Sequence, residues 1–254
     1  MPTANIKPAA RAALAGRYLQ SVSAYCMLIA VYAAIVCCGD VIEAVLVSPL
    51  GADLASAVAT VPVIIGVWLI AAPLMFGIRR FLVAAARGES DVGLVRVFDG
   101  FGTAWRKITA LKARVWLRAF AAGAVQYVAG AVCAELMRGE YIELSSATET
   151  ALGFLASALF AAGAIASVAV LFTYFLSDYL LIGSLDAAPI KSGQALKESR
   201  LMMKGRRLRL FEFYLRFAGW LVLCITGLAV PFVAPYLECA KAHFALGVIS
   251  EERQ

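Results

Sequence analysis

Charged residues inside apolar stretches are the first candidates for chemistry, because a charge in a membrane is costly and often functional. Glu212 and Arg216 lie within an apolar run that starts near residue 208, and Glu238 lies in the last apolar run. An acid four residues before a base is the favourable order for a helical ion pair. Two interpretations stay open for Glu212 and Arg216: an anchoring pair at the start of a helix, which their closeness to Arg209 favours, or a polar site facing a bundle interior.

The last apolar run also carries Lys241 and His243. Glu238 and Lys241 are three residues apart, so they are expected to pair on one helix face. A proton-coupled site that uses Glu238 with His243 is the alternative. A helix on the outer surface, or one that is half buried, explains these residues with fewer assumptions. Asp178 is interpreted as a simple interfacial charge.

Signatures of enzymes and metal sites are missing from the sequence. The chain has no GxSxG, no glycine loop of the phosphate-binding kind and no HExxH, so no catalytic activity is predicted. The six cysteines form no CxxC pair and the chain has a single histidine, so neither a metal nor another cofactor is expected. The cysteines are interpreted as small apolar side chains. A disulfide among Cys37, Cys38 and Cys133 stays open.

The composition indicates a membrane protein. Of the 254 residues, 62% are apolar and 16% are charged, and the mean hydropathy is +0.82. Soluble domains average about 45–50% apolar and about 25% charged residues. The net charge of +6 does not indicate a nucleic-acid partner, because the basic residues cluster beside apolar runs. The lipid bilayer is therefore the first partner that the sequence predicts.

The apolar runs predict one all-α integral membrane domain over residues 1–254, a polytopic transmembrane helix bundle. An uncleaved first helix is preferred to a signal peptide, because no small-residue cleavage site follows it. The last run is short and holds two charges, so five spans remain possible, with that run on the outer surface. We expect about six spans, near residues 19–38, 56–78, 115–137, 152–176, 208–229 and 231–249.

The distribution of basic residues predicts the orientation. Residues 1–18, 79–118 and 178–209 together hold nineteen of the 23 lysines and arginines. The two acidic stretches, residues 40–53 and 138–150, hold one. Cytoplasmic loops of membrane proteins carry the excess of lysine and arginine. The chain is therefore expected in the cell membrane, with its N-terminus inside and, if six helices cross, its C-terminus inside too.

Both large basic segments contain stretches that predict cytoplasmic amphipathic helices in the headgroup layer. In the first, Leu94, Phe98, Phe101 and Trp105 recur at helical spacing, although the glycines around them keep a solvated loop open as the alternative. In the second, one apolar face is expected to end at Gly205. That face consists of Ala195, Leu196, Ser199, Met202 and Met203. Contacts with anionic lipid are predicted for Lys204, Arg206, Arg207 and Arg209.

The stretch ALKESRLMMKGRRLRLFEFYLRFAGWLVL, residues 195–223, with Pro235, Tyr236 and Phe244 after it, resembles a bacterial integral-membrane family catalogued as domain of unknown function 975. Looser matches, IKPAARAALAG, RRFLVAAARGE and VFDGFGTAWRKI, extend the resemblance over nearly the whole chain. Arg216 stands where members usually carry a small polar residue. The resemblance implies a multi-span bacterial membrane protein, and it implies no reaction.

Two classes of function follow. The first is a non-catalytic accessory or scaffold protein that binds partner membrane proteins or anionic lipid, which the basic amphipathic segments favour. The second is a small-solute or lipid transporter that uses Glu212, Arg216 and Glu238. The absence of an evident inverted repeat counts against a transporter. The observation that separates them is whether these three charges line one cavity between helices.

Overall fold

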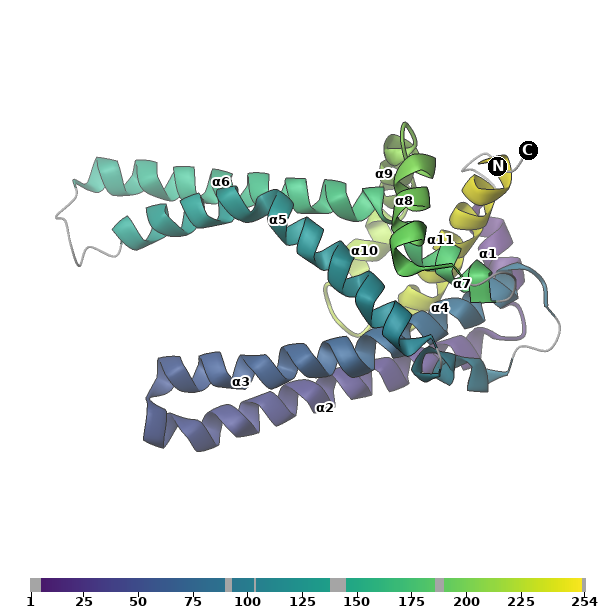
Figure 1. Cartoon of the computed structure of the whole chain (residues 1–254), viewed down its shortest axis with the longest axis horizontal. Helices are drawn as coiled ribbons and strands as arrows, with labels where there is room; N and C mark the ends of the chain where they lie inside the picture. Colours follow the sequence, from purple (N-terminus) through teal and green to yellow (C-terminus); the bar gives the residue numbers. More distant parts are fainter. Residues whose placement is uncertain (1–5, 90–92, 103, 138–144, 186–189, 253–254) are drawn as a thin grey trace.

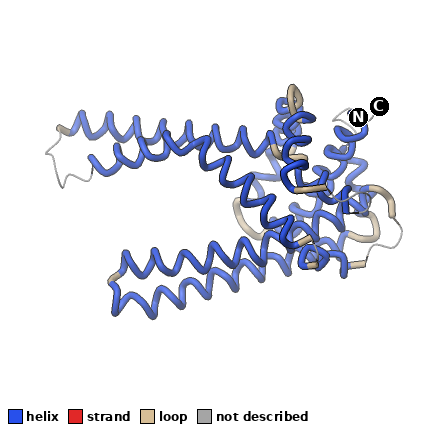
Figure 2. The backbone as a smooth tube through the Cα atoms, viewed as in Figure 1, coloured by secondary structure: helices blue, strands red, loops and turns tan. Residues whose placement is uncertain are grey.

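The structure is a computed structural model that describes residues 6–89, 93–102, 104–137, 145–185 and 190–252. Within these residues every regular element is a helix, so the predicted all-α class is confirmed (Figure 2). The elements are α1 (Ile6–Leu14), α2 (Tyr18–Leu50), α3 (Ala52–Gly66), η2 (Val67–Ala71), α4 (Ala72–Ala86), η3 (Leu94–Phe101), α5 (Trp105–Met137), α6 (Ser146–Thr173), α7 (Ser177–Leu185), α8 (Ser192–Met202), α9 (Arg207–Arg216), α10 (Ala218–Cys224) and α11 (Val230–Glu252).

Two long helical hairpins project to the same side of a compact group of helices (Figure 1). We call α2 with α3 the first arm and α5 with α6 the second arm. The platform is the compact group formed by α1, α4, η3 and α7 to α11 together with the inner ends of α2 and α5. The outer lengths of the two arms lie apart in Figure 1, so the platform is what joins them.

The first arm continues into the platform without a loop. A single wide turn of π-helix, η2, links α3 to α4, and Pro73 follows directly after it. Proline removes one backbone donor, and a local π turn is a common adjustment in such helices. The helix nevertheless runs on from the arm to Arg79.

Small residues bring the two helices of the second arm together. A side chain added at Gly123 would lie 2.8 Å from the carbonyl oxygen of Gly163. Ser167 donates a hydrogen bond from Oγ to the carbonyl oxygen of Ala119 at 2.9 Å, and the Tyr127 hydroxyl lies 3.2 Å from Ser167 Oγ. Gly163 and Ser167 are four residues apart, and small residues at this spacing allow two helices to approach closely.

Five helices of the described chain are long and apolar enough to cross a membrane. Four of them form the arms and the segments that continue them, and the fifth is α11. The predicted span at 208–229 is not one of these five helices, because α9 ends at Arg216 and α10 is only seven residues long. Phe217 separates the two helices, and Gly227 takes a left-handed backbone conformation, φ 73°, in the turn before α11. At 1.5 Å per residue, α10 is about 10 Å long and cannot cross a bilayer.

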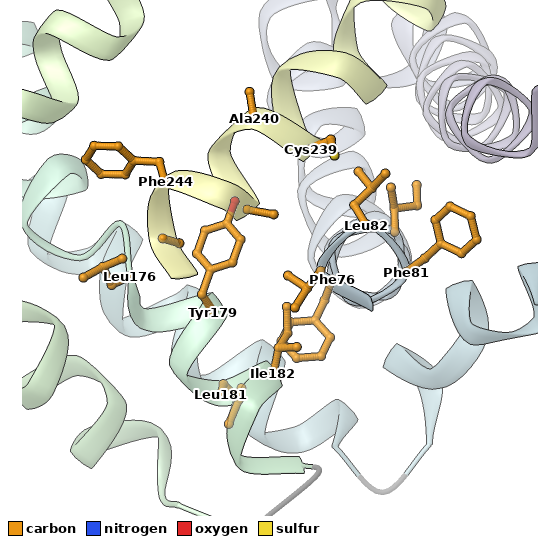
Figure 3. Close-up of a cluster of buried hydrophobic side chains, with 14 of the residues drawn as sticks. Phe76, Phe81, Leu82, Leu176, Tyr179, Leu181, Ile182, Cys239, Ala240 and Phe244 are labelled. Atoms are coloured by element: carbon orange, nitrogen blue, oxygen red, sulfur yellow. The ribbon is translucent and has the colours of Figure 1, made fainter. Parts of the chain in front are cut away.

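The hydrophobic core lies in the platform and not between the arms (Figure 3). Phe76 and Phe81 on α4, Leu176 beside α7 and Phe244 on α11 are all buried. Figure 3 shows Tyr179 of α7 pointing toward α11 within the same cluster. The inner ends of both arms are therefore joined by apolar packing contributed by α7 and α11.

The segment η3 packs against α4 through two glycines. A Cβ atom added at Gly77 would lie 1.8 Å from the carbonyl oxygen of Val97, and one added at Gly100 would lie 2.0 Å from that of Pro73. The expected amphipathic stretch is thus a 3-10 helix whose buried side is Val97 and Gly100, while Phe98 is exposed. The glycines that weaken an α-helix here allow backbone contact between the two elements.

The apolar face predicted for the second basic segment is present on α8. Its members are buried or partly buried, and Gly205 ends the segment with φ 78°. Ser199 donates a hydrogen bond from Oγ to the carbonyl oxygen of Thr173 at 3.1 Å, which fixes α8 to the end of α6.

Replacing Gly77 with alanine should destabilise the platform, because the added methyl group meets backbone that cannot move aside easily. Overpacking of this kind costs about 1–3 kcal/mol. The measurement is the midpoint of thermal unfolding of the purified protein in detergent. Gly219→Ala is the matched control, since it is also helical and an added Cβ would meet no atom within 4 Å. Equal midpoints for the two variants would contradict the packing described for η3.

Candidate functional site

Five charged side chains from four helices meet inside the platform. Asp178 of α7 contacts both Arg79 of α4 and Lys112 of α5 through its Oδ2 atom. Glu238 of α11 accepts hydrogen bonds from Arg79 Nε at 3.1 Å and from Lys241 Nζ at 2.7 Å. These contacts form one continuous chain of alternating charge, which we call the platform ion network.

The network is buried and nearly balanced in charge. The side chains of Asp178 and Glu238 are each 7% exposed, and Lys241 is 13% exposed. Each carboxylate is shared by two cations, so three positive charges face two negative ones. Charges removed from water are tolerated when they are paired in this way, and removal of one partner leaves an uncompensated charge. The network therefore constrains how four helices meet.

The positions of these residues follow from local structure. Asp178 lies in the first turn of α7, where a negative charge is favourable at a helix N-terminus. The break that starts α7 comes directly after α6, so Asp178 stands at the root of the second arm. Lys112 lies near the start of α5, on the other helix of that arm. Arg79 lies on α4, which continues the first arm, so the contact between Arg79 and Asp178 joins the two arms.

Aromatic residues surround the network. Lys241 Nζ lies 5.4 Å from the centre of the Tyr214 ring, a cation–π contact. The hydroxyls of Tyr25 and Tyr179 are buried and have no hydrogen-bond partner within the described part of the chain. Each of the two carboxylates is held by two cations. The geometry suits a structural clamp.

The three charges predicted as an intramembrane site do not meet. Glu212 and Arg216 form an ion pair on α9, with Oε1 at 2.7 Å from Arg216 Nη2, and both side chains are about half exposed. Glu238 belongs instead to the platform ion network. The pairing expected between Glu238 and Lys241 is present at 2.7 Å. In the described part of the chain, no ion pair therefore joins Glu238 to Glu212 or Arg216.

The four basic residues predicted to contact anionic lipid divide into two groups. Arg206 lies 3.0 Å from Glu252, and Arg209 lies 3.1 Å from Glu251, so these two hold α9 to the end of α11. Lys204 and Arg207 are exposed at the turn between α8 and α9. The second pair forms no ion pair within the described residues, whereas Arg206 and Arg209 are held by the two glutamates.

The sequence interpretation missed Arg79 and Lys112, which it counted as cationic residues of a cytoplasmic segment. The apolar residues on both sides of Arg79, at Phe76 and Phe81, were the available signal that this stretch is buried. Asp178 was placed at an interface, whereas its side chain is enclosed. The pairing of these residues across helices far apart in sequence could not be read from spacing.

The described residues contain neither a disulfide bond nor a cluster that could bind a metal ion. All six cysteines are free thiols, including Cys37, Cys38 and Cys133. The described part of the chain holds no group of three or more histidine, cysteine or acidic residues placed to bind a metal ion.

The fold and the network define an all-helical membrane protein in which a clamped platform carries two helical hairpins. The chain belongs to the family described as Protein of unknown function (DUF975), whose model matches residues 1–252. The family suggested by residues 195–223 is thereby confirmed. No curated protein and no solved structure matches the chain.

Replacing Asp178 with asparagine should strongly destabilise the protein, because Arg79 and Lys112 would then face each other across a neutral amide. Breaking a buried pair costs about 3–5 kcal/mol. The measurement is the fraction of monodisperse protein recovered in detergent after heating. Glu212→Gln removes the same charge from an exposed pair, where the expected cost is about 0–1 kcal/mol. Similar losses in the two variants would show that the network does not clamp the platform.

Proposed function

We propose that this protein is a non-catalytic accessory protein of the cell membrane, a scaffold whose arms bind transmembrane helices of partner membrane proteins. The observation that carries the proposal is the exposure of the arms. In the most apolar stretches of α5 and α6, only 11% of the residues are buried. Each arm packs on itself, and its remaining surface is left for lipid or for other helices.

The exposed residues of α6 suit contact with another helix better than contact with lipid alone. Five small residues in the middle of this helix, between Ser157 and Ala164, are exposed, so another helix could approach its backbone closely. Association of helices within a bilayer depends on such packing, since lipid chains are as apolar as leucine. These residues are Ser157, Ala158, Ala161, Ala162 and Ala164.

The transporter alternative has less support. A transporter of this size needs polar groups around a cavity near the middle of the membrane. Glu212 and Arg216 instead pair on an exposed face of α9, and Glu238 is held by Arg79 and Lys241. These charges therefore give no common substrate site, and the scaffold remains the preferred function.

We infer from the basic residues of the platform that it lies at the cytoplasmic side, and the contacts of α11 keep both ends of that helix beside α1 and the start of α2. Helix α11 runs against α1 in the opposite direction: Ile6 lies beside Gly247, and Cys239 lies beside Ala10. The start of α1 and the end of α11 lie close together in Figure 1. In this arrangement the arms cross the bilayer, while α10 and α11 form a hairpin that enters it from the inner side.

Anionic lipid would contribute to the same attachment. Lys204 and Arg207 are exposed on the platform, and a basic residue close to a membrane surface adds about 1 kcal/mol of attraction to anionic lipid. The bilayer, anionic headgroups and partner helices are thus the three partners of the proposed scaffold. No nucleic acid is included among them.

Labelling of introduced cysteines in a cysteine-free background tests the orientation. In intact cells, a membrane-impermeant reagent should label Ser146→Cys at the outer end of the second arm. Lys197→Cys and Ser250→Cys should react only after the cells are opened, because both lie on the platform side. Labelling of Ser250→Cys from outside would show that α11 crosses the membrane, and it would contradict the hairpin arrangement.

Photo-crosslinking tests the scaffold role. A photoreactive amino acid at Ala161, on the exposed small-residue face, should yield adducts with other membrane proteins in cells. The control position is Leu201, which is 61% exposed on the platform and should give few adducts with other membrane proteins. Adducts only with lipid, or only with a second copy of the chain, would contradict binding of partner helices by the second arm.

A further inference from the structure

A pocket of about 350 Å³ opens where the turn after α1 faces α10 and the start of α11. Four of its nine lining residues are aromatic, namely Tyr18, Trp220, Phe232 and Tyr236, and Arg11 is the charged residue that lines it. Ligand sites in proteins measure about 300–1,000 Å³, so this one suits a headgroup with part of an acyl chain. The pocket is separate from the platform ion network.

Hydrogen bonds and ring contacts hold the walls in place. The Tyr18 hydroxyl donates to the carbonyl oxygen of Phe232 at 2.9 Å, which joins α2 to α11. The rings of Trp220 and Tyr236 meet edge to face, with their centres 6.2 Å apart. Gly16, with φ 79°, makes the turn that brings Arg11 and Tyr18 to the same opening. The cavity is therefore formed by the fold without a ligand.

The charge at this opening is positive. Arg11 is exposed at the pocket, and the residues that line the pocket include no acid. One turn earlier on α1, Lys7 Nζ donates to the carbonyl oxygen of Arg216 at 2.9 Å and lies 5.1 Å from the centre of the Phe217 ring. Arginine binds phosphate groups well, because its planar fork donates two parallel hydrogen bonds.

The surroundings place the pocket at a membrane surface. Tyrosine and tryptophan are enriched where a membrane meets water. Tyr18 is the first residue of the first arm, and the neighbouring turn between α10 and α11 carries Ile225 and Leu228, which are 82% and 84% exposed. In the proposed orientation, this turn enters the inner leaflet and the pocket opens beside it.

We propose that this pocket binds one anionic phospholipid of the inner leaflet, with its phosphate on Arg11 and its upper acyl chain against Trp220 and Phe232. A small soluble anion would use Arg11 but would leave the aromatic walls without a partner. A lipid that carries no net charge would fill the walls but would leave the cationic opening unbalanced. The inference rests on the proposed orientation and is independent of what the arms bind.

Quenching of tryptophan fluorescence by brominated lipids tests the proposal. The purified protein is placed in phosphatidylcholine nanodiscs that contain a small fraction of brominated phosphatidylglycerol or of brominated phosphatidylcholine. The signal of the pocket is the part of the quenching that is lost in Trp220→Phe. Phosphatidylglycerol should be enriched about fivefold over phosphatidylcholine, since one basic residue at a surface contributes about 1 kcal/mol.

Matched charge variants decide whether the pocket itself makes the selection. Arg11→Gln should abolish the preference, Arg11→Lys should keep part of it, and Arg200→Gln should leave it unchanged although it removes the same charge from an exposed position on α8. An equal effect of Arg11→Gln and Arg200→Gln would overturn the proposal in favour of general surface attraction. Equal quenching by the two lipids would also overturn the proposal. It would show that lipid reaches Trp220 but that the pocket does not select an anionic headgroup. Quenching by neither lipid would show that the pocket lies outside the bilayer and would overturn the orientation as well.

Discussion

The contact of Asp178 with Arg79 and Lys112 is the interaction on which the rest of the structure depends. Arg79 stands at the inner end of the first arm, and the other two residues stand at the inner end of the second. The arms lie apart beyond this point, so their relative position has to be fixed at the platform (Figure 1). A buried carboxylate between two cations does so, because any arrangement that separates them leaves a charge unpaired away from water.

The network also explains why α11 is held at the platform. Glu238 pairs with Arg79, and Lys241 pairs with Glu238, so the clamp extends from the arms to the C-terminal helix. Apolar packing of Phe244 and Phe76 in the same core adds contacts that depend less on direction. Buried ion pairs contribute little net stability compared with apolar groups of similar size, but they select one arrangement over others. The proposed scaffold role, in which two arms are presented at a fixed separation, would need that selectivity.

Much of the fold could be predicted from the sequence, because the arms are stabilised by local and repetitive features. The apolar runs near 115–137 and 152–176 identify the two helices of the second arm. The stretch at 208–229 was predicted as a span on its apolar content. Its break at Phe217 and the left-handed Gly227 depend on packing against α11 that composition does not reveal. The side chains at 79, 112 and 178 were recognised as charged, but their meeting depends on how the arms are placed.

The central claim is that the platform ion network sets the position of the two arms. Spin labels at Val45 on the first arm and Phe154 on the second, in a cysteine-free protein in nanodiscs, report this position through their distance distribution. The network predicts a narrow distribution in the parent protein and in Glu212→Gln, and a broad or shifted one in Asp178→Asn under conditions in which the helices remain folded. An unchanged narrow distribution in Asp178→Asn would contradict the claim.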